Sequence, residues 1–202
     1  KLNTGSLISQ IKGYFDKDSQ IVETPLCVDG EDVVLFYIEP LIDKKLFSEG
    51  VLAPIEKLVQ KSEQKSAKPG KNSEKNQQKS QDIIDIIKKQ IISVSAVEEI
   101  SDVTEAIDKL FSGNVLVVSQ KKMLVCPVYG LQARGVEEPP TSRVVKGPRE
   151  GFVEDLPRNI GLIRKRLKTP NLKIKELCVG KQTNTQIAIV YLDGIAKSDI
   201  VK

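Results

Sequence analysis

The amino-acid sequence predicts an α/β protein of the mixed α+β class, with two small subdomains that each combine a mixed β-sheet with packed helices. Apolar runs that fit strands alternate with segments in which apolar residues recur at helical spacing. A long polar segment, residues 61–80, contains no apolar side chain larger than Ala67. A turn-rich segment spans residues 130–145. We therefore expect a first subdomain over 1–135, with 61–80 inserted in it, and a second over 136–202.

The first subdomain is expected to begin with one short helix and a β-hairpin. Residues 7–15 carry apolar side chains on one helical face. Two strand-like runs follow at 20–28 and 32–38, and Asp29-Gly30 lies between them. Because a tight two-residue turn requires positive φ, this dipeptide indicates that the two runs pair as a hairpin.

Helices are expected between this hairpin and a second pair of strands. Gly50 is expected to end the first of these helices. The last has Asp102 as its N-cap and Gly113 after its final turn. Strands at 115–119 and 123–129 then form a second hairpin. By helical spacing, the helices cover residues 38–50, 51–60, 82–91 and 102–112.

The polar segment 61–80 is predicted to be a flexible insertion. It carries six Lys and two Glu residues. Such a segment cannot bury enough apolar surface to offset its ordering entropy. A nucleic-acid-binding tail is the alternative, but the lysines are spaced out and interrupted by Glu63 and Glu74.

The second subdomain is expected to pack one helix on a pair of strands. Asp155 can cap this helix, and Pro157 is tolerated in its first turn. Strands follow at 172–179 and 185–192, and the second strand is apolar on both faces, which favours a central position covered on both sides. The helix positions expected to face a core are Leu156, Ile160, Ile163 and Leu167. The cationic positions expected on its surface are Arg158, Arg164, Lys165, Arg166 and Lys168.

Composition removes several classes of function. The chain has no histidine, which excludes Ser-His and Cys-His nucleophiles and histidine-containing zinc sites. It also has no phosphate-binding G-x-x-x-x-G-K-[ST] run and no Cys-x-x-Cys pair. We therefore expect no enzyme activity, no cofactor and no metal. Cys27, Cys126 and Cys178 lie singly in apolar runs and are expected to be reduced, buried thiols.

The scattered cysteines favour a cytosolic compartment, and hydropathy predicts no membrane span in this sequence. No run of about 18 apolar residues is present, and no signal peptide precedes the first helix. The chain does not begin with Met, so we expect it to be a piece of a longer protein. Residues 1–60 carry 6 basic and 10 acidic side chains, whereas residues 143–202 carry 13 and 6. An acidic front and a basic back suggest units that attract one another or face different partners.

The segment GPREGFVEDLPRNIGLIRKRL, residues 147–167, carries a resemblance to a known family. Over residues 134–196 the sequence resembles the A subunits of GerA-type spore germinant receptors, whose Arg…Glu-Pro…Gly-Pro-Arg-Glu-Gly-Phe pattern it follows. Departures are small: Ser142 stands where the family often has Glu, and Lys146 where it often has Arg. The likeness is weaker over residues 1–130.

The resemblance implies a membrane protein of dormant bacterial spores. Its soluble N-terminal domain would precede a bundle of membrane helices and lie on the cytoplasmic side of the spore inner membrane. It implies a transporter-like B subunit and a lipoprotein C subunit as partners, and other A subunits in an oligomeric channel. The assembly would sense nutrients such as amino acids, sugars or ions and trigger germination. By this resemblance the present chain is identified as that N-terminal domain.

The signature residues admit two interpretations. Gly147-Pro148 fits a tight turn and Gly151 a second flexible point, so that Arg149 and Glu150 would be aimed in a fixed direction. In the first interpretation, Arg149 and Glu150 tie the two subdomains, or neighbouring subunits, through hydrogen-bonded ion pairs.

In the second interpretation, Arg149, together with Arg164 or Arg166, holds an anion such as a germinant carboxylate in a cleft between subdomains. The planar guanidinium suits this because it pairs bidentately with a carboxylate. Phe152 is expected to be a core anchor rather than a ligand-stacking ring. Asn159 is expected to cap a loop carbonyl or, as the alternative, to contact a ligand.

Three classes of function therefore stay open at this stage. The domain is a module for germinant sensing, signal coupling and assembly, or it binds a small molecule such as an amino acid or sugar in the cleft between subdomains. Binding of nucleic acid or anionic lipid by the basic second subdomain is the remote alternative. The basic helix carries no known motif for nucleic-acid recognition, and its positive charge can be compensated by the acidic first subdomain. We therefore expect no nucleic-acid partner.

Overall fold

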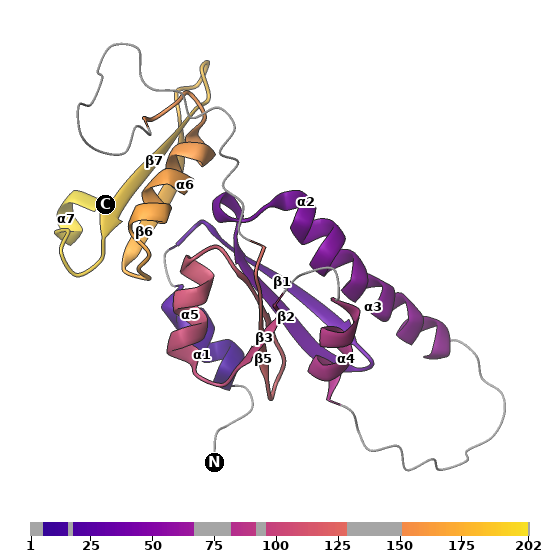
Figure 1. Cartoon of the computed structure of the whole chain (residues 1–202). Helices are drawn as coiled ribbons and strands as arrows, with labels where there is room; N and C mark the ends of the chain where they lie inside the picture. The colour runs from indigo at the N-terminus through magenta and orange to yellow at the C-terminus, as the bar shows by residue number, and fades with distance from the viewer. Residues whose placement is uncertain (1–5, 16–17, 67–81, 92–95, 129–150, 202) are drawn as a thin grey trace, which may run out of the picture.

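The computed structural model describes residues 6–15, 18–66, 82–91, 96–128 and 151–201. These residues form two groups (Figure 1), which we call the sheet unit, within residues 6–128, and the hairpin unit, residues 151–201. The predicted boundary between residues 135 and 136 lies outside the described residues. No helix among the described residues is long and apolar enough to cross a membrane.

The sheet unit is built on a five-stranded sheet in the order β1-β2-β4-β5-β3. Each strand pairs antiparallel with its neighbours. The predicted mixed α+β class is therefore confirmed, with antiparallel pairing in the sheet. The strands are β1 (Ile21–Val28), β2 (Glu31–Ile38), β3 (Glu98–Ile100), β4 (Val115–Val118) and β5 (Met123–Cys126).

Both predicted hairpins of this sheet are confirmed. β1 and β2 meet at Asp29 and Gly30, which have φ values of 50° and 83°. These left-handed conformations are those that the tight turn requires. β4 and β5 pair across residues 119–122. Strand β3 was not predicted, because three residues with two exposed glutamates give no apolar strand pattern, and only pairing with β5 identifies it.

Helices cover both faces of the sheet (Figure 1). On one face lie α1 (Ser6–Tyr14) and α5 (Val103–Phe111), and on the other lie α3 (Ala53–Ser66) and α4 (Ile83–Gln90). Successive residues of β2 point to opposite faces, so Leu35 packs under α3 and α4 whereas Phe36 packs under α1 and α5. Strands β4 and β5 are buried on both faces and are apolar along their whole length.

The connection from β2 to α3 differs from the prediction. It runs through η1 (Glu39–Leu41), α2 (Lys44–Phe47) and a π-helical turn, η2 (Ser48–Leu52), directly into α3. Gly50 therefore does not end a helix. It is buried in the π-helical turn, and the Ala53 N–H donates to the Ser48 carbonyl, so the chain stays helical through the glycine.

The first part of the predicted insertion at 61–80 is helical. Helix α3 continues to Ser66, because Lys, Glu and Gln are good helix formers once a helix has been started by apolar packing. Residues 67–80 of the predicted insertion lie outside the described residues.

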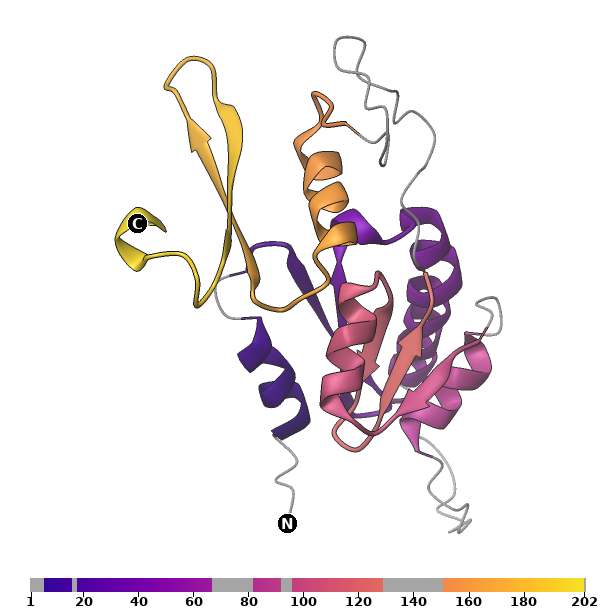
Figure 2. The same ribbon diagram turned by 60° about the vertical axis from the view of Figure 1, so that its left-hand side comes forward.

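The hairpin unit comprises α6 (Leu156–Arg166), β6 (Leu172–Val179), β7 (Thr185–Leu192) and α7 (Ser198–Val201). Figure 2 shows α6 and the hairpin side by side, with the hairpin tip directed away from the sheet unit. Asp155 occupies the N-cap of α6, but its side chain makes no capping hydrogen bond. Gly180 and Asn184 adopt positive φ, 90° and 43°, where the chain turns from β6 to β7.

The prediction that the last strand is central and covered on both sides is wrong for the described residues. β6 is the one described strand that pairs with β7. Ile187 on β7 is 39% exposed, and Leu177 and Val179 on β6 are 37% and 51% exposed. The apolar pattern of β7 is that of a buried strand, but within the described chain only one helix lies against this hairpin.

The prediction of three buried thiols is partly wrong. Cys126 is buried in central strand β5, whereas Cys27 and Cys178 are exposed. Cys27 lies on the edge strand β1, and Cys178 lies in the projecting part of β6. Burial raises the pKa of the Cys126 thiol to about 12.

Candidate functional site

The contact between the sheet unit and the hairpin unit centres on an ion pair between Asp18 and Arg164. The Arg164 Nη2 donates to both carboxylate oxygens of Asp18, at 2.6 Å and 2.5 Å. Both side chains are 0% exposed. The prediction that Arg164 lies on the surface of its helix is therefore wrong.

The geometry of α6 explains the burial of Arg164. Residues four apart share one helical face, so Arg164 lies beside Ile160, which is 2% exposed. This face turns toward η1 and the sheet unit. Leu167, which was predicted to share the core-facing stripe, is 44% exposed. Compared with the predicted stripe, the buried face of α6 thus includes Arg164 in place of Leu167, and it is partly polar.

The Arg164 guanidinium is only partly satisfied where it lies. Its carbon Cζ is 5.5 Å from the centroid of the Phe111 ring on α5, which supplies a cation–π contact. Its Nε and Nη1 have no hydrogen-bond partner among the residues that the structure describes. Buried donors without acceptors are rare in folded proteins because each one loses its hydration without replacement.

Three further polar contacts join the same two segments. Ser19 donates from its backbone N and from Oγ to the carbonyl of Ile174, at 3.2 Å and 2.8 Å. The Lys173 Nζ donates to the Tyr14 carbonyl at 3.1 Å, and the Gln20 side chain donates to Glu176. On the sheet unit, the partners are Tyr14, the last residue of α1, and Ser19 and Gln20, which precede β1.

This arrangement resists gradual sliding of one unit against the other. A buried ion pair is stabilising only at one geometry, since a small displacement leaves two buried charges without partners. The segment at 14–20 connects α1 to β1, so a movement of α1 reaches the hairpin unit directly. Among the described residues no group of three or more His, Cys, Asp or Glu side chains could hold a metal ion.

Part of the predicted signature lies outside the described residues: Gly147, Pro148, Arg149 and Glu150. Gly151 and Phe152 precede α6. Phe152 is 69% exposed, so the expectation that it anchors a core is wrong. Its ring lies on the surface beside Leu162 and Leu167, where it lines a shallow apolar cavity of about 440 Å³.

The remaining predicted residues do not converge on one site. Asn159 holds the start of α6 to the preceding chain: its Oδ1 accepts from the Val153 N at 2.8 Å, and its Nδ2 donates to the Val153 carbonyl at 2.6 Å. Arg166 lines the apolar cavity beside Phe152, whereas Arg164 is buried in the contact with the sheet unit. Arg164 and Arg166 therefore do not form one anion-binding cluster.

Sequence reasoning missed the sheet-unit half of this contact. Asp18, Ser19 and Gln20 lie in a short polar connection between a helix and a strand, which reads as an ordinary loop. A faint signal existed in α6, because Arg164 falls four residues after Ile160 on the apolar face. Its partner is 146 residues away in the chain, and no local pattern encodes that pairing.

Comparison with known proteins defines the class to which this fold belongs. The family model described as "Bacillus/Clostridium GerA spore germination protein" matches residues 9–202. The chain therefore belongs to the GerA family of spore germination proteins. This is a family of germinant receptor subunits rather than an enzyme class.

Individual relatives agree with this assignment. The chain is 40% identical to spore germination protein KA of Bacillus subtilis over 101 residues, which is 47% of this chain and 19% of that protein. It is 28% identical to spore germination protein GerQA of Bacillus cereus over 196 residues, 96% of this chain and 35% of that protein. The matched region thus spans about a third or less of these relatives.

A solved structure has the same fold. The crystal structure of the N-terminal domain of the A subunit of the Bacillus megaterium spore germinant receptor GerK3 matches with a TM-score of 0.63 and 20% identity. The match covers 96% of this chain and 66% of that chain.

Proposed function

We propose that this chain is the N-terminal domain of a germinant receptor A subunit and that it couples nutrient perception to the response of the receptor. Membership of the GerA family and the fold shared with the GerK3 A-subunit domain support the first part. The domain lies on the cytoplasmic side of the spore inner membrane. Its partners are the transporter-like B subunit, the lipoprotein C subunit and other A subunits.

The buried Asp18–Arg164 pair is the observation that carries the coupling function. The pair joins the segment before β1 to α6, and both charged side chains are 0% exposed. A movement of one unit against the other must therefore carry the pair along or break it, and breaking it leaves two buried charges without partners. A contact of this kind can transmit a movement of one unit to the other.

Replacement of the pair by apolar residues separates coupling from stability. Arg164→Met alone leaves Asp18 buried and unpaired, and Asp18→Leu alone leaves Arg164 unpaired. The double variant restores an apolar contact of similar volume, which buried pairs commonly tolerate well. We expect spores that carry the double variant of the full-length protein to contain normal receptor levels but to germinate slowly.

The measurement is the fall in optical density of a spore suspension after addition of a nutrient mixture, with receptor levels determined by immunoblot. Lys181→Met, which removes an exposed cation at the hairpin turn, is the matched control and should germinate normally. If the double variant germinates as fast as the parent, the pair is merely structural and the coupling proposal fails.

Direct binding of a small molecule between the units is the second candidate. An open groove of about 810 Å³ runs between the end of α1 and strand β6. Lys12 and Lys175 line it, together with Glu23 and Glu176. Lys12 is already paired with Glu23, and Gln20 with Glu176, which leaves Lys175 as the group best placed to meet a carboxylate. Saturable binding of an amino acid that Lys175→Gln abolishes would favour this candidate over coupling alone.

A further inference from the structure

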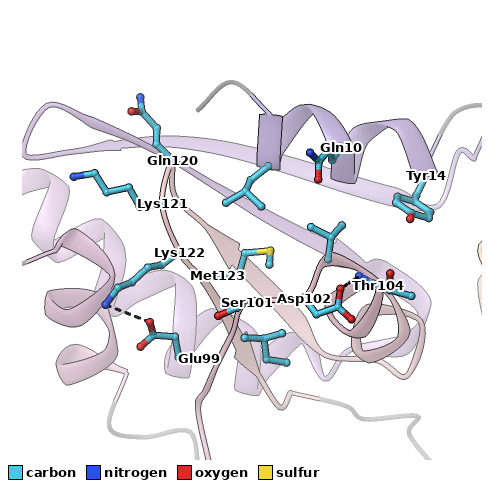
Figure 3. Close-up of a pocket in the computed structure, with 13 residues that line it drawn as sticks. Gln10, Tyr14, Glu99, Ser101, Asp102, Thr104, Gln120, Lys121, Lys122 and Met123 are labelled. Atoms are coloured by element: carbon cyan, nitrogen blue, oxygen red, sulfur yellow. Dashed lines mark hydrogen bonds and ion pairs between the residues drawn. The ribbon is translucent and has the colours of Figure 1, made fainter. Parts of the chain in front are cut away.

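A second cavity, of about 800 Å³, lies wholly within the sheet unit. It is bounded by α1, by the turn from β3 into α5, and by the β4–β5 turn. Figure 3 shows Gln10 and Tyr14 of α1 on one side of it and Ser101 and Thr104 on the other. The predicted site residues of the second subdomain do not contribute to it.

The charged groups around this cavity are already compensated or directed elsewhere. Lys122 pairs with Glu99 at 3.2 Å and with Asp85 at 3.3 Å, and the hydrogen bond that it donates to Glu99 raises the pKa of Lys122. Asp102 accepts from the first backbone N–H groups of α5, at 3.1 Å and 3.4 Å. The N-terminus of α5 is therefore not an anion site. Lys121 extends away from Tyr14 (Figure 3).

The neutral polar groups, in contrast, are available. Within the described parts of the chain, no hydrogen bond is formed by the side chains of Gln10, Tyr14, Ser101 and Thr104. Beneath them lie Ile100 and Met123, which are 7% and 1% exposed and give the cavity an apolar floor. Hydroxyl and amide groups above an apolar floor are suited to a ligand with both characters.

We propose that this cavity binds a small uncharged molecule that carries hydroxyl groups on one edge and an apolar face on the other. Monosaccharides and polyols belong to this chemical class. An ion would lose hydration on entry and, apart from the exposed Lys121 at one end of the lining, would meet charged groups that already have partners, which disfavours it. A neutral polyol exchanges water for the hydroxyl of Thr104, the amide of Gln10 and the phenol of Tyr14 at little cost.

Helix α1 connects this site to the contact between the units. The ring of Tyr14 lines the cavity, and the carbonyl of the same residue accepts the hydrogen bond from Lys173 of the hairpin unit. A ligand that shifts α1 thereby shifts the segment that holds Asp18. This consequence rests on the proposed coupling function, whereas binding itself does not.

The test is a ¹H–¹⁵N NMR titration of the 202-residue chain, since the related GerK3 A-subunit domain has been crystallised as a separate N-terminal domain. The probes are D-glucose and myo-inositol as neutral polyols, and L-leucine and acetate as charged compounds. We expect a neutral probe to give saturable chemical-shift changes at residues 7–14, 100–104 and 120–123. We also expect it to bind with higher affinity than either charged probe.

Variants then locate the site. Thr104→Val and Gln10→Ala each remove one neutral hydrogen bond and should weaken binding by about 3- to 10-fold. Gln186→Ala, an exposed amide on β7, is the matched control and should bind as the parent does. An unchanged spectrum away from the substitution establishes that each variant is folded.

The outcomes separate the two proposals. Absence of saturation with both neutral probes, tighter binding of leucine or acetate, or unchanged affinity in both Thr104→Val and Gln10→Ala would each overturn the site while leaving the coupling function intact. Shifts of Ser19 and Lys173 on binding would support the connection through α1. Saturable binding without any shift at Ser19 and Lys173 would keep the site and overturn its connection to the contact between units.

Discussion

The sheet unit and the hairpin unit are stabilised in different ways. In the sheet unit, helices cover both faces of the sheet and two clusters of apolar side chains lie between the layers. In the hairpin unit, a single helix lies against two strands, and Leu177, Val179 and Ile187 remain exposed. A two-stranded hairpin of this kind is marginally stable on its own.

The difference teaches that the position of the hairpin unit depends on its polar contacts with the sheet unit. Apolar burial is non-directional and is spread over many residues, so the sheet unit tolerates small displacements. The Asp18–Arg164 pair is directional and concentrated in two side chains. The sheet unit is therefore stabilised by a large layered core, whereas the position of the hairpin unit depends on one ion pair and a few hydrogen bonds.

Of the changes considered, breaking the ion pair should produce the largest difference in stability between the two units. Arg164→Met leaves the fully buried Asp18 carboxylate without a partner, which typically costs about 3–5 kcal/mol. We expect hydrogen exchange to accelerate in α6 and β6, while amides in β2 and β4 keep most of their protection. Native-state hydrogen exchange with mass spectrometry resolves the two units.

The control is the Asp18→Leu/Arg164→Met double variant, in which protection of α6 and β6 should return. Equal loss of protection in both units in the single variant would show that they unfold together. The contrast between a robust unit and a dependent one would then be wrong.

The same chemical change placed in each unit sharpens the comparison. Ile84 on α4 is 0% exposed in the core, whereas Ile187 on β7 is 39% exposed. Ile84→Ala should lower the free energy of unfolding by about 2–5 kcal/mol. Ile187→Ala should lower it by less than about 0.5 kcal/mol. Urea denaturation followed by circular dichroism measures both, and comparable losses would show that the hairpin face is covered in solution.

Helix caps give a smaller contrast. Asp102 accepts hydrogen bonds from the backbone N of Thr104 and Glu105 at the start of α5. Asp155 occupies the equivalent position of α6 without such a bond. Asp102→Ala should cost about 1 kcal/mol, and Asp155→Ala less than about 0.5 kcal/mol. The thermal unfolding midpoints of the two variants report the difference, and an equal drop would mean that Asp155 caps its helix in solution.

Features encoded by neighbouring residues could be predicted from the sequence. Asp29-Gly30 identified the first hairpin, because positive φ is a property of the turn residues themselves. Asp102 identified the start of α5, because the cap contacts residues two and three positions later. The mixed α+β class and the antiparallel hairpins follow from such local signals.

Features that depend on distant residues could not be predicted in the same way. Strand β3 is defined by its pairing with β5, and the burial of Arg164 is defined by Asp18. The apolar pattern of β7 favours a covered strand, but it does not say which segment covers it. The four signature residues that precede Gly151 lie outside the described residues, so their interpretations stay predictions.

Thiol chemistry gives the smallest and most local contrast. Burial raises the pKa of Cys126 to about 12, so at pH 8 only about one molecule in ten thousand carries the reactive thiolate, even before access is considered. Ellman's reagent at pH 8 should therefore label Cys27 and Cys178 readily in the folded chain, and Cys126 only after denaturation in guanidinium chloride. In Cys126→Ala the folded chain should give the same count as the parent and the denatured chain one thiol fewer. Rapid labelling of all three thiols in the folded parent would show that the centre of the sheet opens as easily as the hairpin unit, because Cys126 lies on a central strand.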